Sequence, residues 1–247
     1  MSLEMILYVA LGAAVGGFVN GFAGTGTALF ALGFYLVVLD PVRSVAIVAF
    51  MSVLAGLQGL WIVRREILAH PRRLLRFLIP GLIGVPVGLR LLDMIDTSSL
   101  RLAIAGLLIF YGGYFGFRAA LPAFSRKTPV LDSAIGLTGG VLGGAAALSG
   151  AFPAMWLSLR PWPKAEMRAV LQPFNVAILS TTVVLLFFAG AYDRVTMQAL
   201  LISFPIGLIA AQIGIAVFRA ISDTSFRRFL IILTLLMGIG VLVSELT

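Results

Sequence analysis

The sequence predicts an all-α integral membrane protein made of two inverted repeats, each a broken or re-entrant helical hairpin followed by three transmembrane helices. The composition supports this fold class, because 60% of the 247 residues are hydrophobic and only 11% are charged, whereas about a quarter of a soluble domain is charged. The mean hydropathy is +1.08. In addition, the two halves of the chain resemble each other, and the first half opens with an apolar stretch too long for a single crossing.

Charge-free runs along the chain are long enough to cross a membrane. A crossing helix needs about 20 apolar residues. Four runs reach this length, namely residues 44–63, 133–159, 169–192 and 195–218. Three shorter runs are flanked by arginines whose side chains can snorkel to the headgroups. These runs are residues 77–89, 102–117 and 229–244.

An internal repeat predicts the organisation of the chain. The stretch "GGFVNGFAGTGTALF" from Gly16 resembles "GGVLGGAAALSGAFP" from Gly139. Further on, "PGLIGVPVGLRLLDMIDTS" resembles "PIGLIAAQIGIAVFRAISDTS", and the polar residues 118–132 form the natural linker. We therefore expect residues 1–125 to form the first repeat and residues 126–247 the second, together making one transport domain.

The first apolar element is too long for a single crossing. Residues 5–39 carry no charge and would form a helix of about 52 Å, against a membrane core of about 30 Å. We expect a break near residues 23–27, after which the chain doubles back, and an equivalent break at residues 148–150. Such breaks survive in a membrane only where they are buried in protein or line a wet cavity.

The positive charges favour this hairpin topology. With two hairpins, fourteen Lys and Arg residues gather on one face, and only Arg43, Arg90, Arg101 and Arg194 lie on the other. If each opening element crossed once, nine would lie on each side. Because cytoplasmic loops are rich in Lys and Arg, both termini are expected outside. Charge in the loops also indicates contact with the lipid bilayer rather than with nucleic acid.

The polar residues at and near the breaks predict a binding site for an anion. Broken helices of inverted-repeat transporters point their positive N-terminal ends at anionic substrates. Glycine allows the turn, and the hydroxyls and amides donate hydrogen bonds. Ser52 and Asn175 occupy equivalent positions of the two repeats. The predicted substrate-binding residues are Asn20, Gly24, Thr25, Gly26, Thr27, Gln58, Ser149, Gly150, Arg168, Gln172 and Asn175.

Structural explanations of the same residues remain open. Glycines such as Gly17 and Gly140 fit motifs for close helix packing, and buried amides such as Gln172 can hold helices together. Arg168 can be a snorkelling charge at the mouth of a helix, or it can attract an anion toward the pore.

Several absences also narrow the function. No Asp or Glu lies well inside a predicted span, and the only histidine, His70, lies in a basic loop. The sequence contains no metal-ligand cluster, no P-loop and no convincing nucleophile–base pair. We therefore predict no catalytic residue, no metal and no cofactor. A site rich in neutral donors and poor in acids suits an anion.

The motifs "FAGTGTALFAL" at residues 22–32 and "GGAAALSGAFPAMWLSLRPWPKAEMRAVL" at residues 143–171 resemble the TauE/SafE sulfite exporter family, also called the sulfonate/sulfite permease family. The resemblance covers nearly the whole chain. It implies a multi-pass permease of the bacterial inner membrane for sulfite, sulfoacetate or related organosulfonates, often an exporter.

The leading hypothesis is a secondary transporter that exports small sulfur anions by alternating access at a midplane site between the two breaks. The alternatives are an anion channel or facilitator, a transporter of other small organic anions, an intramembrane enzyme and a scaffold subunit. We expect no enzymatic activity, because only scattered hydroxyls and amides lie at depth. The sequence leaves open whether copies of the chain form a homo-oligomer.

Overall fold

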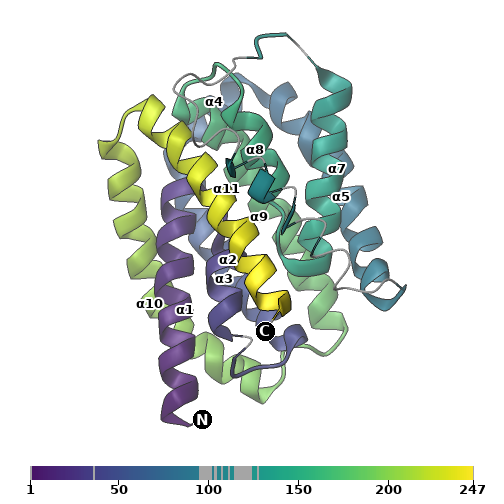
Figure 1. Cartoon of the computed structure of the whole chain (residues 1–247), viewed down its shortest axis with the longest axis vertical. Helices are drawn as coiled ribbons and strands as arrows, with labels where there is room; N and C mark the ends of the chain where they lie inside the picture. Colours follow the sequence, from purple (N-terminus) through teal and green to yellow (C-terminus); the bar gives the residue numbers. More distant parts are fainter. Residues whose placement is uncertain are drawn as a thin grey trace.

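Helices make up the regular structure of the described chain (Figure 1). The computed structural model describes residues 2–35, 37–94, 102, 105–106, 108–110, 112–113, 124–126 and 128–246. Most of the predicted span 102–117 and the first part of the predicted linker lie outside these residues. The helices are α1 (Leu3–Ala23), α2 (Thr27–Tyr35), α3 (Pro41–Ile62), α4 (Arg64–Ala69), α5 (Pro71–Met94), α7 (Pro129–Ala146), α8 (Ala151–Ser158), α9 (Lys164–Phe188), α10 (Arg194–Ala220) and α11 (Asp223–Leu246).

The helices identify a multi-pass membrane protein. In the part of the chain that the structure describes, four segments are long and apolar enough to cross a membrane. They are Leu3–Ala23, Val42–Ile62, Lys164–Phe188 and Arg194–Ala220. Helices α5 and α11 contain 24 residues each, and their charged residues lie near their ends.

The first opening element is interrupted at a pair of glycines. Helix α1 ends where Gly24 adopts φ +80°, and the N–H of Gly24 donates to the carbonyl of Asn20 at 2.7 Å. Gly26 has φ +102°, and L-residues with a side chain rarely adopt either conformation. Helix α2 then returns along α1, because Gly16 of α1 lies against Thr27 and Gly12 lies against Tyr35.

The second opening element is interrupted in a similar way. Helix α7 ends at Ala147, which has φ +56°, and α8 begins four residues later at Ala151. The Nε1–H of Trp156, near the end of α8, donates to Oδ1 of Asp132 at the start of α7 at 2.8 Å. Helix α8 therefore also runs back along the helix that precedes it.

Helix α1 packs closely along α10. Gly17 lies directly against the backbone of Gly207, and Gly21 lies against the backbone of Ala211. Residue numbers rise together along the two helices, so α1 and α10 run in the same direction. Glycine is required here because a side chain would hold the two backbones apart.

Helix α7 packs along α5 through the same type of contact. Gly140 lies against the backbone of Gly81, and Gly144 lies against Val85, so α7 and α5 are also parallel. The first helix of each half thus packs against a helix of the other half. The sequence repeat alone did not indicate that the first helix of each half packs against the other half.

The two ends of the helical assembly differ in charge. At one end, which we call the basic end, Arg73 pairs with Glu166, and Lys164 donates to backbone carbonyls at the end of α10. Helices α5, α7 and α11 begin at this end, whereas α1 and α10 begin at the opposite end, which we call the sparse end. There, Arg43 pairs with Asp193 at 2.6 Å. Both chain termini lie toward the sparse end (Figure 1).

Candidate functional site

The two interrupted segments meet in the interior of the protein. Gly150, just before α8, lies so close to Thr25, between α1 and α2, that an added methyl group would overlap the threonine side chain. Thr25 and Ser149 are 1% and 0% exposed. The segments around Thr25 and Gly150, which are far apart in the sequence, therefore form one buried polar site.

Asn175 of α9 joins the two interruptions. Its Oδ1 accepts a hydrogen bond from Oγ of Ser149 at 2.6 Å and a longer one from Oγ1 of Thr25 at 3.4 Å. Its Nδ2 is buried and has no hydrogen-bond partner among the described residues. Because an unpartnered buried donor is costly, this amide is available to a bound acceptor such as an anion.

A second amide organises the first interruption. The Nδ2 of Asn20 donates to Oγ1 of Thr27 at 2.8 Å and to the carbonyl of Ser52 at 3.0 Å. The hydroxyl of Ser52 and Oδ1 of Asn20 are buried without a partner in the described part of the chain. Ser52 was not among the predicted site residues, although its repeat equivalence to Asn175 was a usable signal.

Arg168 lies at the end of α1, next to the first interruption, and its side chain is fully buried. Its Nη2 and Nη1 donate to the carbonyls of Gly21 and Phe22 in the last turn of α1, at 2.6 and 3.1 Å. The guanidinium also lies 4.3 Å from the ring centroid of Phe218. Its positive charge therefore faces the negative end of the α1 dipole. The interpretation of Arg168 as a snorkelling charge is wrong, because the side chain does not reach the surface.

Gln172 connects Arg168 to α3. Its Oε1 accepts from Nε of Arg168 at 3.1 Å, and its Nε2 donates to the carbonyl of Gly56 at 3.0 Å. Gly24 lies against the same amide, because a Cβ atom added at Gly24 would be 2.7 Å from Oε1. Arg168, Gln172 and Asn175 are spaced four and three residues apart, so they occupy one face of α9.

Two of the predicted residues make other contacts. Gln58 accepts a hydrogen bond from Gln212 at 2.8 Å in an exposed pair, and no described contact links Gln58 to the buried polar site. Gly26 lies against the side chain of Val19, and its role is the turn between α1 and α2.

The site combines neutral donors with one buried cation. No carboxylate of the described residues pairs with Arg168, and the described chain contains no cluster of three or more His, Cys, Asp or Glu residues suited to a metal ion. A buried charge without a counterion is costly. An anion bound nearby would therefore be stabilised by electrostatic attraction as well as by hydrogen bonds.

Comparison with known proteins adds an independent result. Residues 8–241 match the family model described as "Sulfite exporter TauE/SafE". No curated protein and no solved structure matches the chain. The match spans almost the whole sequence, including both interrupted segments and all the residues of the buried polar site. The chain belongs to the sulfite exporter TauE/SafE family.

Proposed function

We propose that this protein exports small sulfur-containing anions, such as sulfite, sulfoacetate or related organosulfonates, across the bacterial inner membrane. The family is one of membrane transporters of sulfur anions, which supports the substrate class. The observation that carries the proposal is the buried polar site, where Arg168 has no carboxylate partner among the described residues and the Nδ2 group of Asn175 has no acceptor.

The proposed architecture is a pair of inverted repeats with two re-entrant hairpins. Its support is the direction of the helices: α1 runs parallel to α10, which starts at the sparse end, and α7 runs parallel to α5, which starts at the basic end. The opening helices of the two halves thus point in opposite directions. In this arrangement, the two interruptions approach mid-depth from opposite leaflets.

The closed state of the site supports a mechanism of alternating access. Its polar side chains are at most 3% exposed, so the anion can enter only after the two halves move apart on one side. The contact between Gly150 and Thr25 lies where the two interrupted segments meet, so we expect a rocking motion to open this contact. The hydroxyls of Thr25 and Ser149 would then turn from Asn175 to the anion.

Export needs no coupled ion in this scheme. With the basic end in the cytoplasm, its arginines raise the local concentration of anions at the entrance. A membrane potential that is negative inside favours anion exit by about 2.3 kcal/mol per charge per 100 mV.

The nearest alternatives are an anion channel or facilitator and a carrier of other small organic anions. Counterflow in liposomes with the membrane potential held at zero separates a carrier from a channel, because substrate on the opposite side accelerates the uptake of labelled substrate only through a carrier.

The proposal is tested with Thr25→Ala and Ser149→Ala in proteoliposomes loaded with sulfite. We expect each variant to need about tenfold more sulfite for half-maximal efflux, because a hydrogen bond to a charged group contributes about 1.5–3 kcal/mol. Thr138→Ala is the matched control, since within the described chain its hydroxyl bonds only to the carbonyl of Ile135, on the exposed side of α7. Normal efflux in both site variants would contradict the proposed site.

A further inference from the structure

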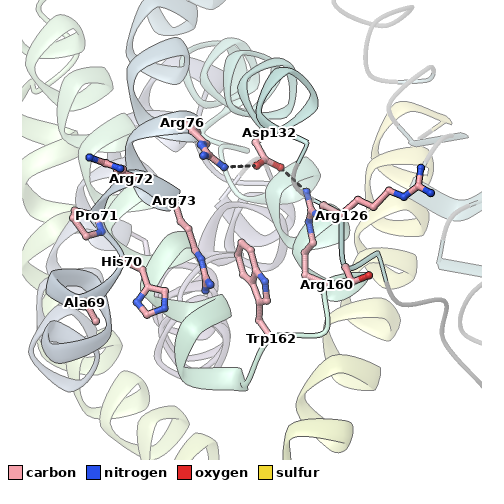
Figure 2. Close-up of a pocket in the computed structure, with 11 residues that line it drawn as sticks. Ala69, His70, Pro71, Arg72, Arg73, Arg76, Arg126, Asp132, Arg160 and Trp162 are labelled. Carbon is pink, nitrogen blue, oxygen red and sulfur yellow. Dashed lines mark hydrogen bonds and ion pairs between the residues drawn. The ribbon is translucent and has the colours of Figure 1, made fainter.

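A pocket at the basic end lies apart from the buried polar site. Its volume is about 490 Å³, and both halves of the chain contribute to it. The lining comes from the end of α4, the first two turns of α5, the segment before α7, the first turn of α7 and the loop between α8 and α9. We call it the basic pocket, and Figure 2 shows its lining, in which Arg73 lies between His70 and Trp162, and Asp132 lies between Arg76 and Arg160.

Positive charge exceeds negative charge in the basic pocket. Five arginines line it, together with a single carboxylate, that of Asp132. Oδ1 of Asp132 accepts from Nη2 of Arg160 at 2.9 Å, whereas its Oδ2 is 3.9 Å from Nη1 of Arg76. Arg72 and Arg126 form no ion pair within the described residues. Because Arg73 pairs with Glu166, and Arg76 and Arg160 face Asp132, the charge that no described carboxylate offsets is that of Arg72 and Arg126, and a bound anion would offset it.

Two buried nitrogen atoms of the lining lack partners. The side chain of Arg160 is 3% exposed, and its Nε has no hydrogen-bond acceptor in the described chain. Nδ1 of His70 also has no hydrogen-bond partner there. Buried polar atoms are rarely left unpaired, and each such atom needs an explanation. An oxyanion in the basic pocket would supply the missing acceptor for the N–H group of Arg160.

Helix direction adds to this preference for an anion. Helices α5 and α7 begin at Pro71 and Pro129, so their positive dipole ends lie at the basic pocket. Guanidinium groups bind phosphate oxygens in pairs, which makes arginine the preferred residue for phosphate.

The surface next to the basic pocket indicates where the phosphate comes from. Arg72 begins a stripe on one face of α5 in which Leu75, Ile79 and Ile83 are 44%, 55% and 63% exposed. In a membrane protein, such a stripe contacts acyl chains. A lipid would place its phosphate among the arginines of the basic pocket and its hydrocarbon chain against this apolar stripe. We propose that the basic pocket binds the phosphate headgroup of an anionic membrane lipid.

This lipid would connect the two halves of the protein, because the basic pocket contains Arg76 from the first half and Arg160 from the second. Basic pockets between transmembrane helices on the cytoplasmic side are typical binding sites for anionic headgroups. The proposal does not depend on which anion is transported.

The test measures thermal unfolding of the delipidated full-length protein in an uncharged detergent. Phosphatidylglycerol is titrated in, with phosphatidylcholine and inorganic phosphate as separate arms. We expect phosphatidylglycerol to raise the unfolding midpoint and phosphatidylcholine to leave it unchanged. Arg76→Gln should weaken the apparent affinity for phosphatidylglycerol about fivefold, because one arginine near an anionic headgroup contributes about 1 kcal/mol.

Arg194→Gln is the matched control, since it removes an exposed arginine at the sparse end and should bind the lipid as the unmodified protein does. Arg72→Gln provides a second pocket variant on the exposed rim, in case Arg76→Gln does not fold. Equal affinities in the pocket variants and the control would overturn the proposal. Stabilisation by inorganic phosphate as strong as by the lipid would overturn the lipid assignment and identify a soluble phosphate as the ligand.

Discussion

At the scale of single residues, Arg168 is a buried charge that has no carboxylate partner among the described residues. Removing a guanidinium from water costs several kcal/mol. Its three hydrogen bonds, to Gly21, Phe22 and Gln172, and the negative end of the α1 dipole offset part of this cost. A carboxylate partner would neutralise this charge, and the proposed attraction of an anion depends on there being none among the described residues.

Gly150 offers a direct test of the contact between the two interrupted segments. A methyl group at Gly150 would overlap the Thr25 side chain, so we expect Gly150→Ala to destabilise the protein by about 1–3 kcal/mol and to abolish efflux. The measurement pairs thermal unfolding with the proteoliposome assay.

Gly240→Ala is the control for that substitution, because nothing lies within 4 Å of the added methyl group. Within the C-terminal part of α11, alanine should stabilise the helix by about 0.5–1 kcal/mol. If the two substitutions had equal effects on unfolding and efflux, the two segments would not be in functional contact.

Some residues of the candidate site could be anticipated from the sequence. Thr25, Ser149 and Asn175 were among the predicted residues, because hydroxyls and amides are conspicuous in apolar runs, and the structure brings them together. The contacts of Arg168 were not predictable, since they depend on α1 passing beside α9. Gln58 has the same chemistry as Gln172 but faces Gln212, and residue type alone does not reveal this direction.

At the scale of helices, the positions of the interruptions were accessible to sequence reasoning, whereas the helix partners were not. Gly24 and Gly26 adopt positive φ, which is a local property of glycine. The packing of α1 on α10 depends on backbone contact between Gly17 and Gly207. Glycines at helical spacing indicate that some helix approaches closely, but they do not identify which one.

An ion pair at the sparse end connects α3 to α10. Asp193 begins α10, and a hydrogen bond from Arg43 of α3, followed by one from the backbone N–H of Thr196, lowers the pKa of Asp193 to about 2. A carboxyl whose pKa is lowered on folding stabilises the protein above its ordinary pKa of about 3.9, and this contribution disappears as the pH falls toward the folded value.

We therefore expect Asp193→Asn to lower the unfolding midpoint at about pH 6 and to have little effect near about pH 2. The measurement is thermal unfolding in detergent across this range. Asp223→Asn, at the start of α11, is the control for the loss of one carboxylate at a helix start. A difference between Asp193→Asn and the unmodified protein that stays constant with pH would show that the ion pair contributes nothing.

At the scale of the whole molecule, the distribution of charge and the direction of the helices point to the same orientation. The chain has a net charge of +8, and its arginine-rich segments meet at the basic end, where α5, α7 and α11 begin. Since positive loops remain in the cytoplasm, we expect the basic end inside and both termini outside. If residues 5–39 instead crossed the membrane once without a break, the N-terminus would lie on the opposite side of the membrane from the sparse end.

The absence of cysteine from the sequence makes this orientation measurable with single introduced thiols. We expect a membrane-impermeant maleimide to label Ser2→Cys, and a cysteine appended after Thr247, in intact cells. Ser125→Cys, which lines the basic pocket, should react only after the membrane is opened. The unmodified cysteine-free protein is the control for background. Labelling of Ser125→Cys in intact cells would show the opposite orientation, in which the arginines of the basic end could not concentrate cytoplasmic anions for export.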